Sequence, residues 1–255
     1  MELIFDCEDR YMPILENFIY GSKAQIVFAY IPKAACSNWK CILRYLQGYS
    51  NYLDTNIFHD RKKSGLIYLS ELENAEEILY NASIPKLTFV RNPYTRILSA
   101  YLNKIKPFSE NESILDMNFY QIYINIDNFR KKHFPKKKIV DFECFINWLY
   151  ESKNCYTQNE HWIPQSTILG LDKVKFDFIG KFERFSTDVA KILKIMKCDI
   201  PFPTQKDINF PPTRANELVD YYYNSELVEK VKKIYLNDFL LLNYSFDLKD
   251  CRKGL

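Results

Sequence analysis

The sequence predicts an α/β fold in which a central parallel sheet is flanked by helices. Two short apolar runs are each followed by a polar turn and an amphipathic helix, the first within residues 26–46 and the second within 86–105. Such uninterrupted runs are typical of strands that are covered on both faces, as in parallel sheets. The chain has 255 residues and is 47% hydrophobic, which is enough for one sizeable core. We therefore predict a single domain over residues 1–255.

The first strand and helix lie around residues 25–39, which read QIVFAYIPKAACSNW. The strand is predicted to break at Pro32, and Ser37 or Asn38 is then the expected cap of a helix that continues to Leu46.

The turn between them has the properties of an anion cradle. Ala34, Ala35 and Cys36 are small enough for backbone N–H groups to approach a phosphate or sulfate, and the helix start adds partial positive charge. Lys33 adds a full charge, although a lysine after a strand is often only a solvated loop residue. A Walker loop is not predicted, because the Gly180-Lys181 pair is followed by phenylalanine.

The second strand and helix lie within residues 86–105. Arg91 follows the strand, Asn92 is the expected helix cap, and Pro93 suits the first helical position. Ligands bind at the carboxyl ends of strands in open α/β sheets, so Arg91 and Ser99 are candidates to bind a phosphate. A salt-bridged arginine and a serine bonded to its own helix are the alternatives.

The other elements follow from caps and apolar periodicity. The predictions are a capping box of Ser70 and Glu73 opening a helix through Leu79, a helix capped by Asp141 through Leu149, a strand at 175–179, a helix at about 186–196, and terminal helices beginning near Asn216 and Ser225.

Together these segments resemble the sulfotransferases that use 3′-phosphoadenosine 5′-phosphosulfate (PAPS), in particular the Golgi carbohydrate branch that contains the chondroitin and dermatan 4-O-sulfotransferases. The matching motifs are Pro32 to Trp39, Arg91 to Tyr94 with Ser99 to Tyr101, His161-Trp162 with Pro164, Asp177 to Glu183, and Tyr235 with Asp238-Phe239 and Asn243-Tyr244. The resemblance implies a P-loop-like three-layer sandwich, a core at about residues 25–245, and a variable acceptor-facing insertion at 106–140.

The resemblance also implies the ligands. PAPS is the expected donor and adenosine 3′,5′-bisphosphate (PAP) the product, with no metal. The expected reaction is in-line transfer of the sulfuryl group to a carbohydrate hydroxyl. The donor-binding residues would be Pro32, Lys33, Ala34, Ala35, Cys36, Ser37, Asn38 and Trp39 at the 5′-phosphosulfate, with Arg91 and Ser99 at the 3′-phosphate.

Two residues are expected to carry the chemistry. Lys33 would stabilise the negative charge that builds on the oxygens around sulfur. The acceptor hydroxyl needs a base, and the sequence offers only His59, His133 and His161. We favour His59, which lies between the donor motifs, because imidazole titrates near neutral pH; a surface role is its alternative. His161 is the competitor, as a substrate-binding residue or a structural partner of Glu160.

The expected partner is a glycan, or a glycolipid or nucleotide-linked sugar. A basic cluster between Arg130 and Lys138 would attract an anionic acceptor, or would be a solvated charge run. A lipid-linked acceptor would bring the protein to a membrane surface. The net charge of +3 is too small to indicate nucleic acid, and no nucleic-acid motif accompanies it. The oligomeric state stays open.

The cysteines and the apolar segments indicate the cellular compartment in which we expect the protein. The seven cysteines form no Cys-x-x-Cys pair, and their odd number leaves one over in any full disulfide scheme, so we expect reduced thiols. The sequence has no signal-peptide pattern and no apolar stretch of membrane-spanning length. We expect a cytoplasmic protein of bacterial type, with the Golgi lumen as the alternative for a trimmed catalytic fragment.

Two other functions stay open. An ATP-dependent P-loop-like phosphotransferase would need a Walker serine or threonine and a carboxylate for magnesium, and neither is evident near Lys33. A noncatalytic nucleotide- or glycan-binding protein would keep the fold without turnover.

Overall fold

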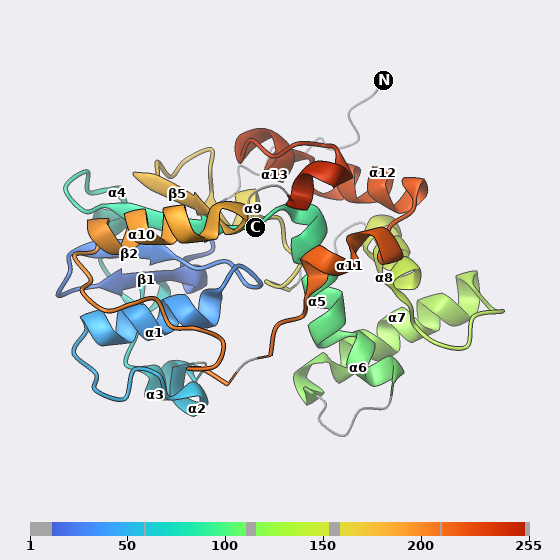
Figure 1. The fold of residues 1–255 in the computed structure, drawn as a ribbon, viewed down its shortest axis with the longest axis horizontal. Coiled ribbons are helices and arrows are strands. Elements are labelled where there is room, and N and C mark those ends of the chain that lie inside the picture. Colours follow the sequence, from blue (N-terminus) through green and yellow to red (C-terminus); the bar gives the residue numbers. More distant parts are fainter. Residues whose placement is uncertain (1–11, 59, 111–115, 153–158, 210, 253–255) are drawn as a thin grey trace.

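The computed structural model describes residues 12–58, 60–110, 116–152, 159–209 and 211–252. These residues form a five-stranded sheet with helices on both faces, and a further group of helices stands beside one end of the sheet (Figure 1). In the described ranges, no helix combines the length and the apolar character that crossing a bilayer requires.

The sheet has the strand order β3-β1-β2-β4-β5. Strands β2 (Ile26–Ala29), β4 (Lys86–Val90) and β5 (Phe178–Lys181) are parallel, as predicted. Strands β1 (Phe18–Gly21) and β3 (Ile67–Tyr68) are antiparallel to their neighbours, so the sheet is mixed and the prediction of parallel strands is wrong at this edge. Connection length explains the hairpin, because four residues join β1 to β2 and a parallel crossover needs a dozen or more.

Both faces of the sheet are buried. Successive side chains of a strand point to opposite sides, so alternate residues of β2 belong to two different core clusters. One cluster lies between the sheet and helices α1 (Cys36–Leu46) and α10 (Phe185–Ile195). The other lies between the sheet and helices α4 (Ala75–Tyr80) and α9 (Gln165–Leu169). The predicted α/β architecture, a sheet between helical layers, is confirmed.

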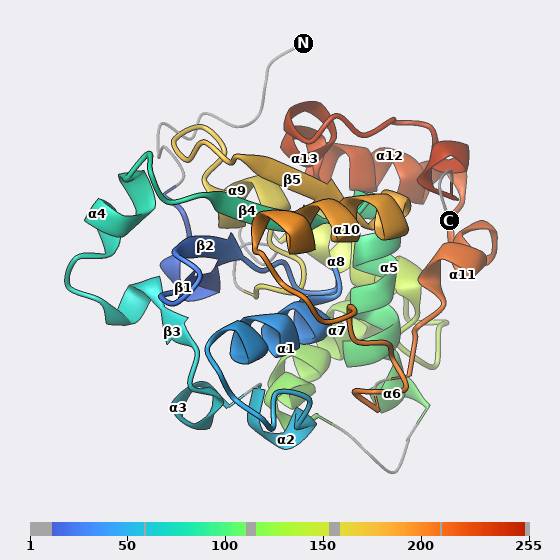
Figure 2. The ribbon, with the colours of Figure 1, turned by 60° about the vertical axis from the view of Figure 1, so that its left-hand side comes forward.

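A third core cluster lies among the helices beside the sheet (Figures 1 and 2). It is built by α5 (Pro93–Lys104), α7 (Tyr120–His133), α8 (Phe142–Glu151), α11 (Ala215–Tyr222) and α12 (Ser225–Ile234). The apolar stripe of α5 faces into this cluster, which leaves the rest of that helix available for a site at the end of β4.

Short helices and turns connect the layers. They are α2 (Thr55–Phe58), α3 (Arg61–Ser64), α6 (Lys106–Ser109), α13 (Leu236–Leu241), and 3-10 turns at Leu15–Asn17, Leu69–Glu71, Met117–Phe119, Phe182–Arg184 and Leu248–Arg252.

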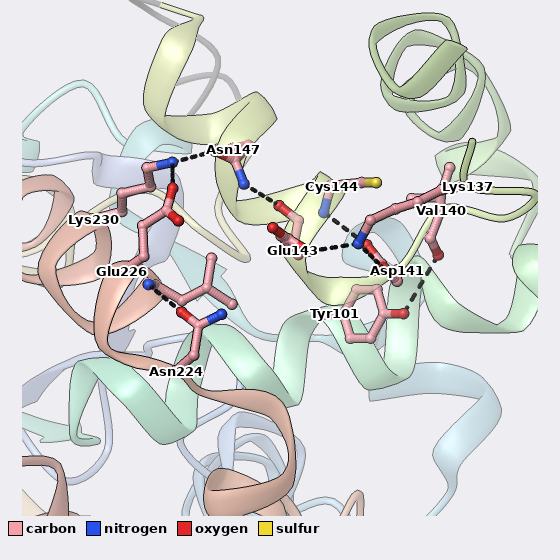
Figure 3. Close-up of polar contacts among 11 residues, drawn as sticks. Tyr101, Lys137, Val140, Asp141, Glu143, Cys144, Asn147, Asn224, Glu226 and Lys230 are labelled. Atoms are coloured by element: carbon pink, nitrogen blue, oxygen red, sulfur yellow. Dashed lines mark hydrogen bonds and ion pairs between the residues drawn. The ribbon is translucent and has the colours of Figure 1, made fainter. Parts of the chain in front are cut away.

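Polar contacts fix α8 within the helical group (Figure 3). Asp141 caps the helix by accepting a hydrogen bond of 2.9 Å from a first-turn N–H group, as predicted. Lys137 donates to Asp141 and, at 2.5 Å, to Glu143. Asn147, which is only 3% exposed, donates to the carbonyl oxygen of Glu143 and accepts from Lys230 of α12. The contacts therefore tie α8 to α12 as well as to its own N-terminus.

Two predicted caps are wrong. Helix α1 begins at Cys36, after Ala35 in the left-handed conformation (φ 58°), so Ser37 and Asn38 lie inside its first turn instead of before it. Residues 69–71 form a 3-10 turn, and α4 begins only after Asn74, so the capping box of Ser70 and Glu73 does not open a helix.

Most other boundaries lie within three residues of the prediction. The first strand ends at 29 instead of 31, and β5 occupies 178–181 instead of 175–179. Helix α10 is displaced by one residue from the predicted 186–196. The terminal helices begin at 215 and 225, where they were expected near 216 and 225.

Close packing explains the glycine of the Gly180-Lys181 pair. A Cβ atom at 180 would lie 2.6 Å from Cδ2 of Phe89 and 2.9 Å from Cδ1 of Ile192, so these side chains would have to shift to admit it. Lys181 donates from Nζ to the carbonyl oxygen of Asn243 at 2.8 Å. The pair is structural, in agreement with the absence of a Walker loop.

Candidate functional site

A cavity of about 1140 Å³ lies where the parallel strands β2 and β4 end. Its walls are the loop after β2, the start of α1, one face of α5, and the segment 202–217. The predicted site residues that line it are Lys33, Ala35, Cys36, Ser37, Asn38, Arg91, Ser99 and His161. The two predicted anion-binding segments therefore meet at one cavity.

The loop after β2 has an uncommon backbone. Lys33 and Ala35 both have positive φ angles, of 70° and 58°. Such angles cost free energy in residues other than glycine and persist where surrounding contacts hold them. One of these contacts is a hydrogen bond of 3.0 Å from Nη1 of Arg91 to the carbonyl oxygen of Lys33. The conformation of the first segment thus depends on the second.

The side chain of Lys33 is half-buried and points into a basic environment. Its Nζ donates a hydrogen bond of 2.7 Å to Oδ1 of Asn103 on α5. Burial lowers the pKa of Lys33 to about 7; the charges of Lys104 and Arg91 act in the same direction, and Cys36 opposes them. A neighbouring anion would reverse this shift, because it favours the ammonium form.

Arg91 is only 5% exposed, and its side chain is held at several points. Nε donates to Oγ1 of Thr95 at 3.1 Å, and Nη2 donates to Oδ1 of Asn216. The guanidinium also lies over the ring of Phe182, 4.5 Å from its centroid. Burial lowers the pKa of Arg91 to about 10, so the group remains a cation at neutral pH. Among the described residues, protein atoms accept hydrogen bonds from three of its five N–H groups, so two N–H groups remain for a ligand.

The main chain of Arg91 is held by a buried amide. Gln165 accepts from the N–H of Arg91 at 2.9 Å and donates from Nε2 to its carbonyl oxygen at 2.8 Å. Asp238, which is fully buried, in turn accepts from the N–H groups of Gln165 and Ser166 and from the hydroxyl of Ser166. The Asp238 motif therefore acts on the site through Gln165.

A second support reaches the next residue. Glu183 accepts a hydrogen bond of 2.7 Å from the N–H of Asn92 and one of 3.0 Å from the hydroxyl of Tyr244. Burial raises the pKa of Glu183, although these two hydrogen bonds and the charge of Arg91 oppose the shift. The Glu183 and Tyr244 motifs thus hold the turn between β4 and α5.

Ser99 lines the cavity from the second turn of α5, as predicted, and its hydroxyl lies 2.9 Å from the hydroxyl of Thr213. Thr213 and Asn216 belong to the segment 202–217, to which we assigned no site residue from the sequence. The sequence feature that points to this segment is the pair of prolines at 211–212, just before the terminal helices, because it marks a stiff loop instead of a helix.

Three predicted donor-binding residues lie behind the cavity instead of lining it. Pro32 and Ala34 are buried, and the carbonyl oxygen of Pro32 accepts from Nε of Arg96 at 3.1 Å. Trp39 is fully buried, with its ring 4.6 Å from that of Phe202. These side chains support the loop, and only the backbone of the three residues is left to contact the donor.

The candidate bases are placed differently. Nδ1 of His161 lies 2.9 Å from Oδ1 of Asn159, and its ring is nearly perpendicular to the ring of Phe119, with the centroids 5.2 Å apart. His161 lines the cavity, so it stays a substrate-binding candidate. His59 lies outside the described residues, and its role as the base stays a prediction.

The described residues of the segment 106–140 include α6, the 3-10 turn at Met117–Phe119, and α7. None of its described residues lines the cavity, and its Phe119 reaches the site through the contact with His161. Part of its basic cluster is paired, since Arg130 and Lys131 both contact Asp127. Its role towards an acceptor stays a prediction.

Of the described residues, no three or more His, Cys, Asp or Glu side chains are grouped so that they could hold a metal ion. Cys36, Cys41, Cys144 and Cys198 are thiols, and Cys36 alone of these four lines the cavity.

Comparison with known proteins identifies the family. A profile described as "Sulfotransferase family" matches residues 16–245. Carbohydrate sulfotransferase 14 of Danio rerio is 31% identical over 241 residues, which cover 91% of this chain and 63% of the relative. The protein of the same name from Homo sapiens is 28% identical over 237 residues, with coverages of 91% and 61%. Carbohydrate sulfotransferase 12 of Mus musculus is 24% identical over 275 residues, with coverages of 95% and 64%.

This chain therefore spans about three fifths of the length of these relatives. No solved structure matches it. The motif resemblance seen in the sequence is confirmed by the profile match, which extends over nearly all the described elements. The chain belongs to the sulfotransferase family.

Proposed function

We propose that this protein transfers the sulfuryl group of PAPS to a hydroxyl group of a carbohydrate. The observation that carries the proposal is the convergence of Lys33, Arg91 and Ser99 on one cavity from two separate segments. Two cations and a helix N-terminus suit a ligand with anionic groups at both ends. Similarity to carbohydrate sulfotransferases over 91% of the chain supports this choice.

The residues present fit the donor. Lys33 and the first-turn N–H groups of α1 suit the 5′-phosphosulfate, and the two remaining N–H groups of Arg91 suit the 3′-phosphate. The cavity wall also contains three aromatic rings, those of Phe182, Phe185 and Phe202, which suit stacking of a base. The cavity exceeds the usual size of a small-molecule pocket, so it has room for part of an acceptor.

The chemistry requires charge stabilisation and a base. PAPS supplies an activated sulfuryl group; the acceptor oxygen forms the new bond to sulfur while the bond from sulfur to the bridging phosphate oxygen breaks. Lys33 stabilises the charge that this oxygen gains, and the N–H groups at the start of α1 stabilise the nonbridging oxygens. We propose His59 as the base that takes the hydroxyl proton, on the sequence argument alone.

Calorimetric titration tests the donor site. We expect PAP to bind without metal and Arg91→Ala to lose this binding, whereas Lys132→Ala, which removes an exposed cation on α7, should bind as the wild type does. ATP with magnesium is the competing titrant. Binding of ATP alone would exclude PAPS as the donor and favour the phosphotransferase alternative.

Transfer of radiolabelled sulfate tests catalysis separately. His59→Ala should retain PAP binding and lose transfer; full turnover in this variant would move the base to another residue, with His161 next to be tested. PAP binding without transfer to any glycan would favour the noncatalytic alternative.

The acceptor is part of the same proposal. A glycan, glycolipid or nucleotide-linked sugar is the expected class, and screening such acceptors with labelled PAPS identifies the sugar. A cytoplasmic location is likewise proposed, and cell fractionation of the native protein tests it.

A further inference from the structure

We infer that Asn103 is a positioning residue, which holds the side chain of Lys33 in place and favours its ammonium form. The catalytic role of Lys33 rests on the proposed function, whereas the contact itself does not. Lys33 Nζ donates to Asn103 Oδ1 at 2.7 Å, and both side chains line the cavity.

The position of Asn103 on α5 makes this contact part of the donor site. Asn103 follows Ser99 by four residues, so the two side chains lie on one face of the helix, one turn apart. One helix face thus carries Ser99 at the proposed 3′-phosphate end and Asn103 at the sulfate end. Arg91 holds the carbonyl oxygen of Lys33, and Asn103 holds its ammonium group, so the residue is fixed at both ends.

Lys33 needs such a partner because its surroundings disfavour its charge. Burial, Lys104 and Arg91 each lower its pKa, and Cys36 is the group that acts in the opposite direction. The other titratable side chains on the cavity wall are His161, Lys206, Arg214 and Glu217. An amide oxygen accepts a hydrogen bond from the ammonium form and therefore favours it.

The choice of a neutral acceptor also has a physical reason. A carboxylate at position 103 would form an ion pair with Lys33 and compete with an incoming anion for the same charge. The amide of Asn103 orients the ammonium group without neutralising it, so the charge of the ammonium form remains available to the donor.

Replacement of Asn103 should therefore change the titration of Lys33 in opposite directions. In Asn103→Leu the pKa of Lys33 should fall by about one unit, the equivalent of one hydrogen bond to a charged group. In Asn103→Asp it should rise by at least a similar amount, because the new charge favours the ammonium form.

Competitive labelling with acetic anhydride measures this directly. The protein is labelled between pH 5 and 10, and mass spectrometry follows the peptide that contains Lys33. We expect a wild-type midpoint near 7, a lower midpoint in Asn103→Leu, and a higher one in Asn103→Asp. Asn128→Asp makes the same chemical change at an exposed position on α7 and should leave the midpoint unchanged.

Equal midpoints in the wild type and both Asn103 variants would overturn the inference. Labelling needs no turnover, so this failure is distinct from failure of the proposed reaction. In the transfer assay, a positioning role predicts that Asn103→Leu loses more kcat/KM for the donor above pH 7 than below it, because kcat/KM reports the ionisation of the ligand-free protein. A loss of kcat/KM equal at every pH would indicate structural damage instead and count against the inference.

Discussion

Nη1 of Arg91 donates a hydrogen bond of 3.0 Å to the carbonyl oxygen of Lys33, across 58 residues of sequence. The two proposed donor-binding segments are therefore joined directly, and the arginine holds the loop that presents the lysine. From the sequence alone, loss of Arg91 is expected to weaken donor binding more than chemistry. Because of this hydrogen bond, loss of Arg91 should also displace Lys33 and so slow the transfer.

Arg91→Lys keeps the charge and removes the planar group that reaches Lys33, Thr95 and Asn216. We expect PAP to bind at least about tenfold more weakly, because hydrogen bonds to charged groups contribute about 1.5–3 kcal/mol each. Calorimetric titration measures the affinity, and kcat at saturating donor measures the displacement of Lys33. An unchanged affinity would show that charge alone is sufficient at this position.

Gln165→Ala tests the support behind Arg91. Gln165 is fully buried and does not line the cavity, yet it pairs with both backbone polar groups of Arg91. Leaving these groups without partners costs about 1–3 kcal/mol each, so the variant should unfold at lower urea concentration and bind PAP more weakly. Lower stability with undiminished PAP affinity would contradict a role in placing Arg91.

Glu183→Gln tests the buried carboxyl group at the start of α5. Burial raises the pKa of Glu183 in the folded protein above its ordinary value of 4.5, so its contribution to stability is fully present below pH 4.5 and is lost as the pH rises through the raised value. A glutamine side chain does not titrate, so its contribution to stability does not change with pH. The melting temperature of the variant relative to wild type should therefore be higher at pH 7 than at pH 4.

Thermal unfolding of both proteins at the two pH values measures this difference. The same difference at pH 4 and pH 7 would mean that Glu183 titrates alike in the folded and unfolded chain.

Alkylation of Cys36 tests whether the donor fills the cavity. Cys36 is half-buried on the cavity wall at the first position of α1, so a bulky maleimide there should abolish PAP binding. PAP should in turn protect Cys36 but not Cys198, which is also half-buried and does not line the cavity. Mass spectrometry of the two peptides reports both rates, and equal protection of the two thiols would argue for a general conformational effect.

Asp141→Ala provides a change in stability away from the site. The variant loses the cap of α8 and a partner of Lys137, so the free energy of unfolding should fall by about 1–2 kcal/mol. PAP affinity should stay the same, because neither residue lines the cavity. Urea unfolding and calorimetry together check this, and a parallel loss of PAP binding would extend the site into the helical group.

Local patterns predicted much of the fold. The strand before Arg91, the cap at Asn92 and the helix from Pro93 are as expected, because apolar periodicity, a cap side chain and proline act over a few neighbouring residues. The same rules were wrong at Ser37, which lies inside the first turn of α1, and at Ser70, which lies in a 3-10 turn. The antiparallel edge of the sheet was also not predicted, since short strands such as the two-residue β3 leave little pattern.

The sequence by itself determined which kinds of group the site would have. Lys33, Arg91 and Ser99 could be recognised because each stands at a fixed place relative to its own strand or helix. Only the tertiary structure decided that Trp39 is buried behind the loop and that Asn103 and Asn216 reach the site. Asn103 is 70 residues from Lys33 and Asn216 is 125 residues from Arg91, so these contacts exist only once the sheet and the helices around it have packed.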